Sequence, residues 1–143
     1  MKKIIIGSDH AGFEMKEHLR AFLREEGFAI TDKGTYSSES TDYPDFAHAV
    51  AREVENDSDA TGVLLCGSAN GVAITANKHP GIRAALCWSN EVASLARQHN
   101  NANIICIPAR FVNSAEAEKM TMTFLETEFE GGRHQRRVEK IDC

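Results

Sequence analysis

A cysteine precedes a run of small residues near the middle of the chain, Cys66-Gly67-Ser68-Ala69-Asn70-Gly71. The apolar stretch 62–66 has the length and composition of a buried strand. Small side chains let successive backbone N–H groups turn inward, and with the start of a following helix they form a nest for an anion. A thiol at the mouth of such a nest is favoured as thiolate, because N–H dipoles stabilise the charged form. The alternative is a tight turn without a ligand.

Asn70 in this run has two expected uses. It can adopt the left-handed backbone region, which asparagine tolerates better than most residues, or it can orient a ligand oxygen. The other cysteines inside apolar stretches, Cys87 and Cys106, are expected to be buried small hydrophobes.

A second polar segment, Gly7-Ser8-Asp9-His10-Ala11-Gly12, follows the first apolar stretch of the chain. It has the glycine spacing that opens a P-loop, but Phe13 and Glu14 stand where Lys and Ser/Thr would follow, and no G-x-G-x-x-G occurs here or after Cys66. Nucleotide loops are therefore excluded. The segment instead sets a carboxylate beside an imidazole, and the structural alternative for Asp9 is a helix cap.

His99 and Asn100 end a helical segment at about 90–98. A histidine near a helix end either interacts favourably with the helix dipole or works as a general acid–base near neutral pH. The sequence has no His-x₃-His or His-Glu-x₂-His spacing, and the cysteine gaps match no common zinc pattern. We therefore expect no metal.

The charge is unevenly distributed. Residues 1–130 carry a net charge of −7, whereas residues 131–143 carry +2 and include Arg133, Arg136 and Arg137. An acidic body does not fit duplex nucleic acid, but guanidinium groups suit a compact anion such as a phosphate. The alternative is a solvated basic helix end. No apolar run reaches the roughly 20 residues that span a membrane, and Asp9 and His10 interrupt the first run too early for a signal peptide. We expect a cytoplasmic protein.

Apolar stretches alternate with segments of helical period along all 143 residues. The expected strands are 3–6, 28–31, 62–66, 83–87 and 103–107, and helices lie between them, with Ser114 as the N-cap of the fifth and a short last helix after Gly132. This pattern predicts an α/β fold: one three-layer, doubly wound sandwich with a five-stranded parallel sheet, Rossmann-like. Ligands then bind beyond the carboxyl ends of the strands.

Six groups of residues occur in order, with near-constant spacing, between about residues 3 and 140. They are Gly7–Phe13; Asp32–Thr35 with Thr41–Pro44; Cys66–Ser68 with Ala76–Lys78; Gly81–Ala84; Arg97–Asn100; and Glu130–Glu139. Together they resemble the B-type ribose-5-phosphate isomerases, whose wider family includes isomerases of allose 6-phosphate and galactose 6-phosphate.

The resemblance implies an aldose–ketose isomerase without metal or cofactor. It interconverts ribose 5-phosphate and ribulose 5-phosphate through an enediolate, a step of the pentose phosphate pathway. Cys66 matches the thiolate base that moves the proton between C1 and C2, and Ser68 assists it. The backbone N–H groups that hold the enediolate oxygens match Gly67, Ser68, Ala69, Asn70 and Gly71. His99 matches the group that opens the furanose ring.

The remaining matches concern binding. Asp9 and His10 match sugar contacts, with Asp9 also counted among the catalytic groups, and Asn100 matches a further contact. The phosphate-binding residues match Arg110, Arg133 and Arg137, with His134 beside them. Family members are dimers or tetramers with sites between subunits, so we expect a homodimer or homotetramer. The C-terminal basic helix, about 131–142, completes the site in this single domain of residues 1–143.

Two positions depart from the family pattern. Val72 stands where some members have a catalytic glutamate, so this sequence resembles the cysteine type. Ala69 stands where glycine is more frequent, and its methyl group restricts the backbone. Two alternative functions stay open at this point: a hexose-6-phosphate isomerase, and a non-catalytic sugar-phosphate sensor that uses the same pocket.

Overall fold

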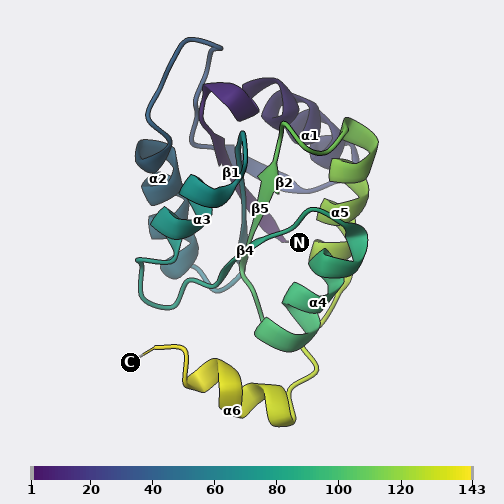
Figure 1. The fold of residues 1–143 in the computed structure, drawn as a ribbon. Coiled ribbons are helices and arrows are strands. Elements are labelled where there is room, and N and C mark those ends of the chain that lie inside the picture. Colours follow the sequence, from purple (N-terminus) through teal and green to yellow (C-terminus); the bar gives the residue numbers. More distant parts are fainter. Residues whose placement is uncertain (1, 143) are drawn as a thin grey trace.

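The computed structural model describes residues 2–142 and contains a five-stranded parallel sheet (Figure 1). Its strands are β1 (Lys3–Ser8), β2 (Ala29–Asp32), β3 (Ala60–Cys66), β4 (Ala84–Leu86) and β5 (Ile104–Pro108). Their spatial order is β2-β1-β3-β5-β4, and every pairing is parallel. The predicted sheet is confirmed, with each strand within two residues of its expected position.

Helices cover both faces of the sheet. They are η1 (His10–Gly12), α1 (Phe13–Glu25), α2 (Tyr43–Glu55), α3 (Asn70–Ala76), α4 (Asn90–Asn100), α5 (Ser114–Glu126) and α6 (Arg133–Glu139). The core on one face includes side chains of α1, α4 and α5, and the core on the other face includes those of α2 and α3. The three-layer fold class is confirmed. Among residues 2–142, no helix has both the length and the apolar character needed to cross a membrane.

The N-cap of α5 differs from the expectation. Asn113, not Ser114, caps this helix: its side chain accepts from the N–H of Glu116, and Glu116 accepts from the N–H of Asn113 in return. Both residue types make good caps, and the glutamate three residues after Asn113 completes a capping box. The sequence contained this signal one position before the predicted cap.

Strand β3 shows why the strands read as continuous apolar runs. Val63 and Leu65 pack in the core with α1, α4 and α5, whereas Leu64 and Cys66 pack in the core with α2 and α3. Successive side chains of a strand point to opposite faces, and here both faces are covered. The side chain of Cys66 consequently belongs to the α2–α3 side.

A close contact sets η1 directly against β3. A Cβ atom on Gly12 would lie 2.8 Å from the Cβ atom and 2.9 Å from the carbonyl oxygen of Leu65. Only glycine permits this approach, which is shorter than real Cβ contacts. The residues at the start of η1 are thereby held beside the end of β3.

Lys16 is a buried charge that the sequence pattern did not reveal. Its side chain on α1 is 0% exposed, and its ammonium donates to Asp32 Oδ2 at 2.6 Å and Glu17 Oε2 at 2.9 Å. Hydrogen bonds from Arg20 and then Lys16 lower the pKa of Glu17 to about 2. The other oxygen of Asp32 accepts from the N–H of Gly34 at 2.8 Å. This network fixes α1 to β2 and to the loop after β2.

Asp32→Asn is expected to lower the free energy of unfolding by about 2 kcal/mol, because it leaves the buried ammonium short of negative charge while the amide oxygen still accepts from Gly34. Lys16→Met removes the charge itself and is expected to change stability by less than about 1 kcal/mol. Denaturant unfolding followed by circular dichroism compares the two. An equal decrease in the free energy of unfolding in both variants would contradict this explanation, in which Asp32→Asn destabilises the protein by leaving a buried charge uncompensated.

Candidate functional site

A pocket of about 480 Å³ opens at the carboxyl ends of β1, β3 and β5. Its lining residues are Asp9, His10, Ala11, Tyr43, Cys66, Gly67, Ser68, Gly71, Arg110 and Phe111. The chain leaves β1 towards the face covered by α1 and leaves β3 towards the face covered by α3, so the pocket lies at a topological switch point. Open α/β sheets bind ligands in such crevices.

Cys66 is the last residue of β3 and is 5% exposed. Its carbonyl accepts from the N–H of Ala109 at 2.9 Å, and the carbonyl of Gly67 accepts from the N–H of Arg110 at 3.1 Å. A Cβ atom on Gly67 would lie 3.0 Å from Arg110 Nη1, so the guanidinium packs against the loop. Backbone bonds therefore hold Arg110 beside the cysteine loop, although 44 residues separate the two in sequence.

The other two described cysteines are enclosed in the core. Cys87 and Cys106 are both 0% exposed. Burial raises the pKa of Cys87 to about 12 and raises that of Cys106 well above its usual range. The expectation that both are buried small hydrophobes is confirmed. Of the described cysteines, only Cys66 lines the pocket, and Cys143 lies outside the described residues.

The turn between β3 and α3 uses Ala69 where the sequence pointed to Asn70. Ala69 has φ of 65°, in the left-handed region, whereas Asn70 is the first residue of α3. Of the two uses expected for Asn70, the left-handed conformation is therefore wrong, and the orientation of a ligand oxygen stays a prediction. For an alanine this backbone costs on the order of 1 kcal/mol. The methyl group of Ala69 is fully buried in the α2–α3 core and does not line the pocket.

Ser68 is exposed at the pocket and bonded within the loop. Its hydroxyl oxygen accepts from the backbone N–H and from the side-chain amide of Asn70, both at 3.3 Å. A serine hydroxyl that accepts these bonds keeps its own proton to donate. The hydroxyl of Ser68 is thus available as a donor on the pocket side.

Asp9 and His10 are held by backbone groups. Asp9 Oδ1 accepts from Ala11 and Gly12 at 3.0 and 3.2 Å, so the capping function occurs, while Asp9 also lines the pocket. The N–H of Thr41 donates to His10 Nδ1 at 3.1 Å. The proton of the neutral imidazole is therefore on Nε2, where His10 offers a donor.

Two aromatic residues of the pocket carried no assigned function in the sequence analysis. Tyr43 comes from the start of α2, and a Cβ atom on Gly71 would lie 2.5 Å from its ring. Phe111 follows β5 and is 75% exposed. Their positions in loops after strands were the signal that could have identified them.

The remaining predicted site residues form a second group around α4 and α6. The rings of His99 and His134 stack with centroids 4.2 Å apart and planes inclined by 13°. Glu130 Oε1 lies 3.5 Å from His134 Nε2 and 4.0 Å from His99 Nε2. Asn100 ends α4, and the exposed Arg133 and Arg137 lie on α6.

Burial, then the charge of Arg133, lowers the pKa of His134, and the nearby Glu130 opposes this shift in part. The donor atoms of His99, Glu130 and His134 lie within 4.8 Å of one another. A bound metal lies in the ring plane of each histidine ligand, and two stacked, nearly parallel planes share no such point. The observed arrangement is that of a stacked pair beside a carboxylate.

The two groups occupy opposite edges of the sheet. Cys66 pairs with Pro108 at the carboxyl end, whereas Asn103, just after the α4 turn, bonds to Gly62 and Arg83 near the amino ends of β3 and β4. The seven residues of β3 extend about 23 Å. Figure 1 draws α6 beyond the edge of the sheet opposite to η1. None of His99, Asn100, Arg133, His134 and Arg137 lines the Cys66 pocket.

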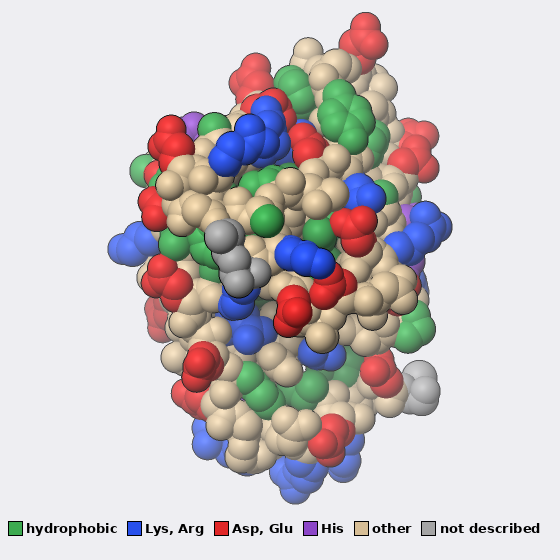
Figure 2. Space-filling view, turned by 180° about the vertical axis from the view of Figure 1, so that it is seen from behind, with side chains coloured by type: hydrophobic (Ala, Val, Ile, Leu, Met, Phe, Trp, Pro, Cys, Tyr) green, Lys and Arg blue, Asp and Glu red, His purple; other side chains and the backbone are tan. Residues whose placement is uncertain are grey.

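Basic side chains gather near the second group. On the face in Figure 2, Lys and Arg side chains project from the lower edge, at the height where Figure 1 draws α6, while acidic and basic side chains alternate over most of the rest. On this face, the positive charge is therefore concentrated at the end near α6.

Residues 4–141 match the model of the Ribose/Galactose Isomerase family. The chain is 45% identical to ribose-5-phosphate isomerase B of Escherichia coli, over 99% of this chain and 95% of that protein. A ribose 5-phosphate isomerase structure from Thermotoga maritima superposes with a TM-score of 0.96 at 49% identity, covering 99% of this chain and 97% of the other. The Mycoplasma genitalium ribose-5-phosphate isomerase B with bound ribulose-5-phosphate gives 0.94 at 46% identity, covering 97% and 93%. The chain belongs to the ribose/galactose isomerase family.

Proposed function

We propose that this protein interconverts ribose 5-phosphate and ribulose 5-phosphate. One observation carries the proposal: a relative with bound ribulose-5-phosphate has the same fold over 97% of this chain at 46% identity. The pocket at the ends of β1 and β3 supplies a thiol, hydroxyl and imidazole donors, and a loop of small residues around the thiol. These are the groups that proton transfer beside a carbonyl requires.

Cys66 acts as the base in the proposed reaction. As thiolate it takes the proton from C2 of the open-chain aldose, the C2 electron pair forms the enediolate double bond, and the negative charge goes to the oxygen on C1. Return of the same proton to C1, with transfer of the O2 proton to O1, gives the ketose. Cys66 suits this function because it is the thiol at the pocket, whereas Cys87 and Cys106 are enclosed in the core.

The enediolate oxygens are stabilised by N–H groups of the loop from Gly67 to Gly71. Preorganised donors of this kind are worth about 3 kcal/mol each when one is removed. Ser68 adds a hydroxyl whose proton is not used within the loop. The buried methyl group of Ala69 stays on the core side, so the alanine leaves the pocket side of the loop unobstructed.

His99 opens the furanose ring, and Asp9 and His10 bind the sugar, with Asp9 orienting the reacting oxygens. The Nε2–H of His10 is a donor for a sugar oxygen. Asn100 adds a further contact. The phosphate is bound by Arg110, Arg133 and Arg137 with His134, and it supplies positioning energy at a distance from the reacting carbons.

The site forms between two chains in this proposal. Within one chain, His99 and the α6 arginines are at the opposite edge of the sheet from Cys66, so they reach that pocket only from a partner. A two-fold symmetric homodimer, alone or within a homotetramer, then has two equivalent sites, each completed by the C-terminal helix of the other subunit.

We also propose a cytoplasmic location, supported by the free thiols of Cys66, Cys87 and Cys106.

The purified protein is expected to convert ribose 5-phosphate in the presence of a metal chelator, with a smaller kcat/KM for allose 6-phosphate. Cys66→Ala is expected to lower kcat by about 10²-fold or more while substrate still binds, because the base is lost. Cys106→Ser is the control: its buried hydroxyl costs about 1–3 kcal/mol of stability, and kcat is retained. A coupled assay and isothermal calorimetry give these values.

Three outcomes would contradict the proposal. Preference for allose 6-phosphate would assign a hexose phosphate as substrate. Binding without turnover in the wild type would indicate a sensor. Wild-type kcat in Cys66→Ala would remove Cys66 as the base.

A subunit-mixing experiment tests the shared site. Cys66→Ala and Arg137→Ala are each expected to impair activity, the first through kcat and the second through KM. If the two residues meet across subunits, a mixed dimer has one doubly damaged site and one intact site. Random assortment then restores about a quarter of wild-type activity. Co-expression followed by steady-state assays measures the recovery, and no recovery would mean that both residues serve the same site from one chain.

Arg136→Ala is the matched control for Arg137→Ala. Arg133 and Arg137 are four residues apart and share a helix face, whereas Arg136 points about 100° away from Arg137. Arg136→Ala is therefore expected to leave KM nearly unchanged. Equal effects of the two substitutions would show that α6 acts through diffuse charge.

A further inference from the structure

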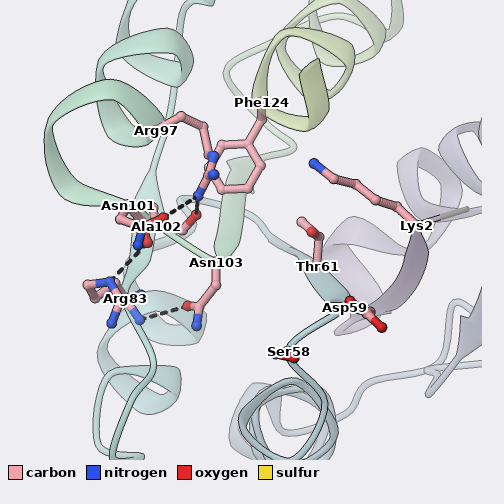
Figure 3. A pocket seen from close by; sticks show the side chains of 10 residues that line it. All are labelled: Lys2, Ser58, Asp59, Thr61, Arg83, Arg97, Asn101, Ala102, Asn103 and Phe124. Atoms are coloured by element: carbon pink, nitrogen blue, oxygen red, sulfur yellow. Dashed lines mark hydrogen bonds between the residues drawn. The ribbon is translucent and has the colours of Figure 1, made fainter. Parts of the chain in front are cut away.

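A second cavity, of about 600 Å³, lies at the amino edge of the sheet (Figure 3). Its lining residues are Lys2, Ser58, Asp59, Thr61, Arg83, Arg97, Asn101, Ala102, Asn103 and Phe124. It shares no residue with the Cys66 pocket and contains none of the residues proposed above for catalysis or phosphate binding. The proposed isomerase site leaves this cavity without a function.

Three cations face the cavity, and neutral acceptors hold them in place. Arg97 Nε donates to the carbonyl of Thr127 at 3.1 Å, and Arg83 Nε donates to the carbonyl of Asn101 at 2.9 Å. Lys2 Nζ donates to the carbonyl of Leu125 at 2.6 Å. Figure 3 shows Lys2 extending from one wall towards Arg97 and Phe124 on the other.

The positive charge in the cavity is only partly balanced. Within residues 2–142, neither arginine nor Lys2 has a carboxylate within 4.0 Å, and Asp59 is the one acidic residue of the lining. Burial and the charge of Arg97 lower the pKa of Lys2, and the nearby Glu128 offsets part of this decrease. Burial and then Arg83 lower the pKa of Arg97. The cations therefore repel one another in a partly desolvated space, which a bound anion would relieve.

The guanidinium groups retain donors for such an anion. A guanidinium has five N–H donors, and the Nη2 atoms of Arg83 and Arg97 make no hydrogen bond to the described residues. The ammonium of Lys2 has two further protons beyond its bond to Leu125. Forked donors from two arginines and a lysine match the oxygens of a phosphate group.

The rest of the lining is uncharged, and four of its six residues are polar, the apolar ones being Ala102 and Phe124. Ser58 and Thr61 offer hydroxyl groups on the wall next to Asp59, and Asn103 lies on the arginine wall. Hydroxyl and amide groups of this kind pair with ligand hydroxyls. The volume lies within the usual range of small-molecule sites.

We propose that this cavity binds a small phosphorylated metabolite, with its phosphate between Lys2, Arg83 and Arg97 and its hydroxyl groups on Ser58 and Thr61. The cavity shares no lining residue with the Cys66 pocket, and it contains none of the groups that a partner subunit is proposed to contribute to that pocket. The negative charge of Asp59 repels the anion and lowers its affinity for the cavity.

The test is a titration of the ¹⁵N-labelled full chain, followed through the backbone amide signals of Thr61, Ala102 and Asn103. The probes are inorganic phosphate and glycerol 3-phosphate, with chloride at equal ionic strength as the reference. Both phosphates are expected to shift these three signals with saturation, and glycerol 3-phosphate is expected to bind more tightly because it adds hydroxyl contacts. Chloride is expected to leave the signals in place.

Three charge variants assign the site. Lys2→Gln is expected to weaken phosphate binding at these signals about three- to tenfold, and Asp59→Asn is expected to strengthen it by a similar factor, since each changes one unit charge at the cavity. Lys3→Gln is the matched control, because it removes the same charge from the next residue. Lys3 does not line this cavity, and its ammonium lies 2.9 Å from Asp57 Oδ2. This substitution is expected to change the affinity less than twofold.

Several results would overturn the proposal. One is the absence of any shift at these amides with phosphate up to about 50 mM, where a site of millimolar Kd is nearly full. Another is equal weakening by Lys2→Gln and Lys3→Gln, which would indicate diffuse attraction. A third is movement confined to the signals of α6, since phosphate would then bind only at Arg133 and Arg137. Weaker binding of glycerol 3-phosphate than of inorganic phosphate would contradict the proposed contacts between ligand hydroxyl groups and the cavity.

Discussion

Parallel pairing of all five strands constrains everything else in this molecule. It brings the loops that follow the strands to one edge of the sheet and the ends of the returning helices to the other. Cys66 is at the first edge, and His99 with α6 is at the second. Within one chain, the two edges are separated by a strand length of about 23 Å. A reaction that needs both sets of groups therefore needs two chains, and the polarity of the sheet is the reason.

Close backbone contacts give the Cys66 edge its shape. Gly12 lets η1 contact Leu65, and Gly71 leaves room for the ring of Tyr43. Ala69 accepts a left-handed backbone at a cost on the order of 1 kcal/mol, and its buried methyl group recovers part of that cost through core contacts. The loop conformation is thus fixed from the core side. The pocket side of the loop can therefore consist of small groups while the loop keeps a single conformation.

The sequence predicted the fold well because the periodic signals were strong and local. Five apolar stretches separated by helical segments leave few arrangements besides a covered parallel sheet. The strand-end loops were predicted for the same reason, and the structure brings Asp9, His10, Cys66 and Arg110 into one pocket. The expectation that these residues act on a sugar phosphate came from a resemblance and not from periodicity.

What the sequence did not reveal depends on contacts between distant segments. Lys16 sits in a helical stripe like a surface residue, but it is fully buried because Asp32 from the next strand meets it. Intrinsic preference made Asn70 a candidate for the left-handed conformation, besides a contact to a ligand oxygen, but Ala69 adopts this conformation in the structure. The stacking of His134 on His99 joins two helices separated by α5, which no local pattern encodes.

The same sheet polarity explains which groups bind which charges. Helices begin near the carboxyl edge, where backbone N–H groups are free, so a small developing oxyanion can be stabilised there by the main chain with little help from side-chain cations. The returning helix α4 ends at the amino edge, where carbonyl groups and the negative end of its dipole repel anions. Any phosphate bound at that edge must therefore be held by side-chain cations. Arginines accordingly lie around the end of α4, as Arg133 and Arg137 on α6 and as Arg83 and Arg97 at the amino-edge cavity. Within one chain, the backbone donors around Cys66 and the arginines of α6 thus lie at opposite edges of the same sheet, and Arg110 is the arginine on the Cys66 side.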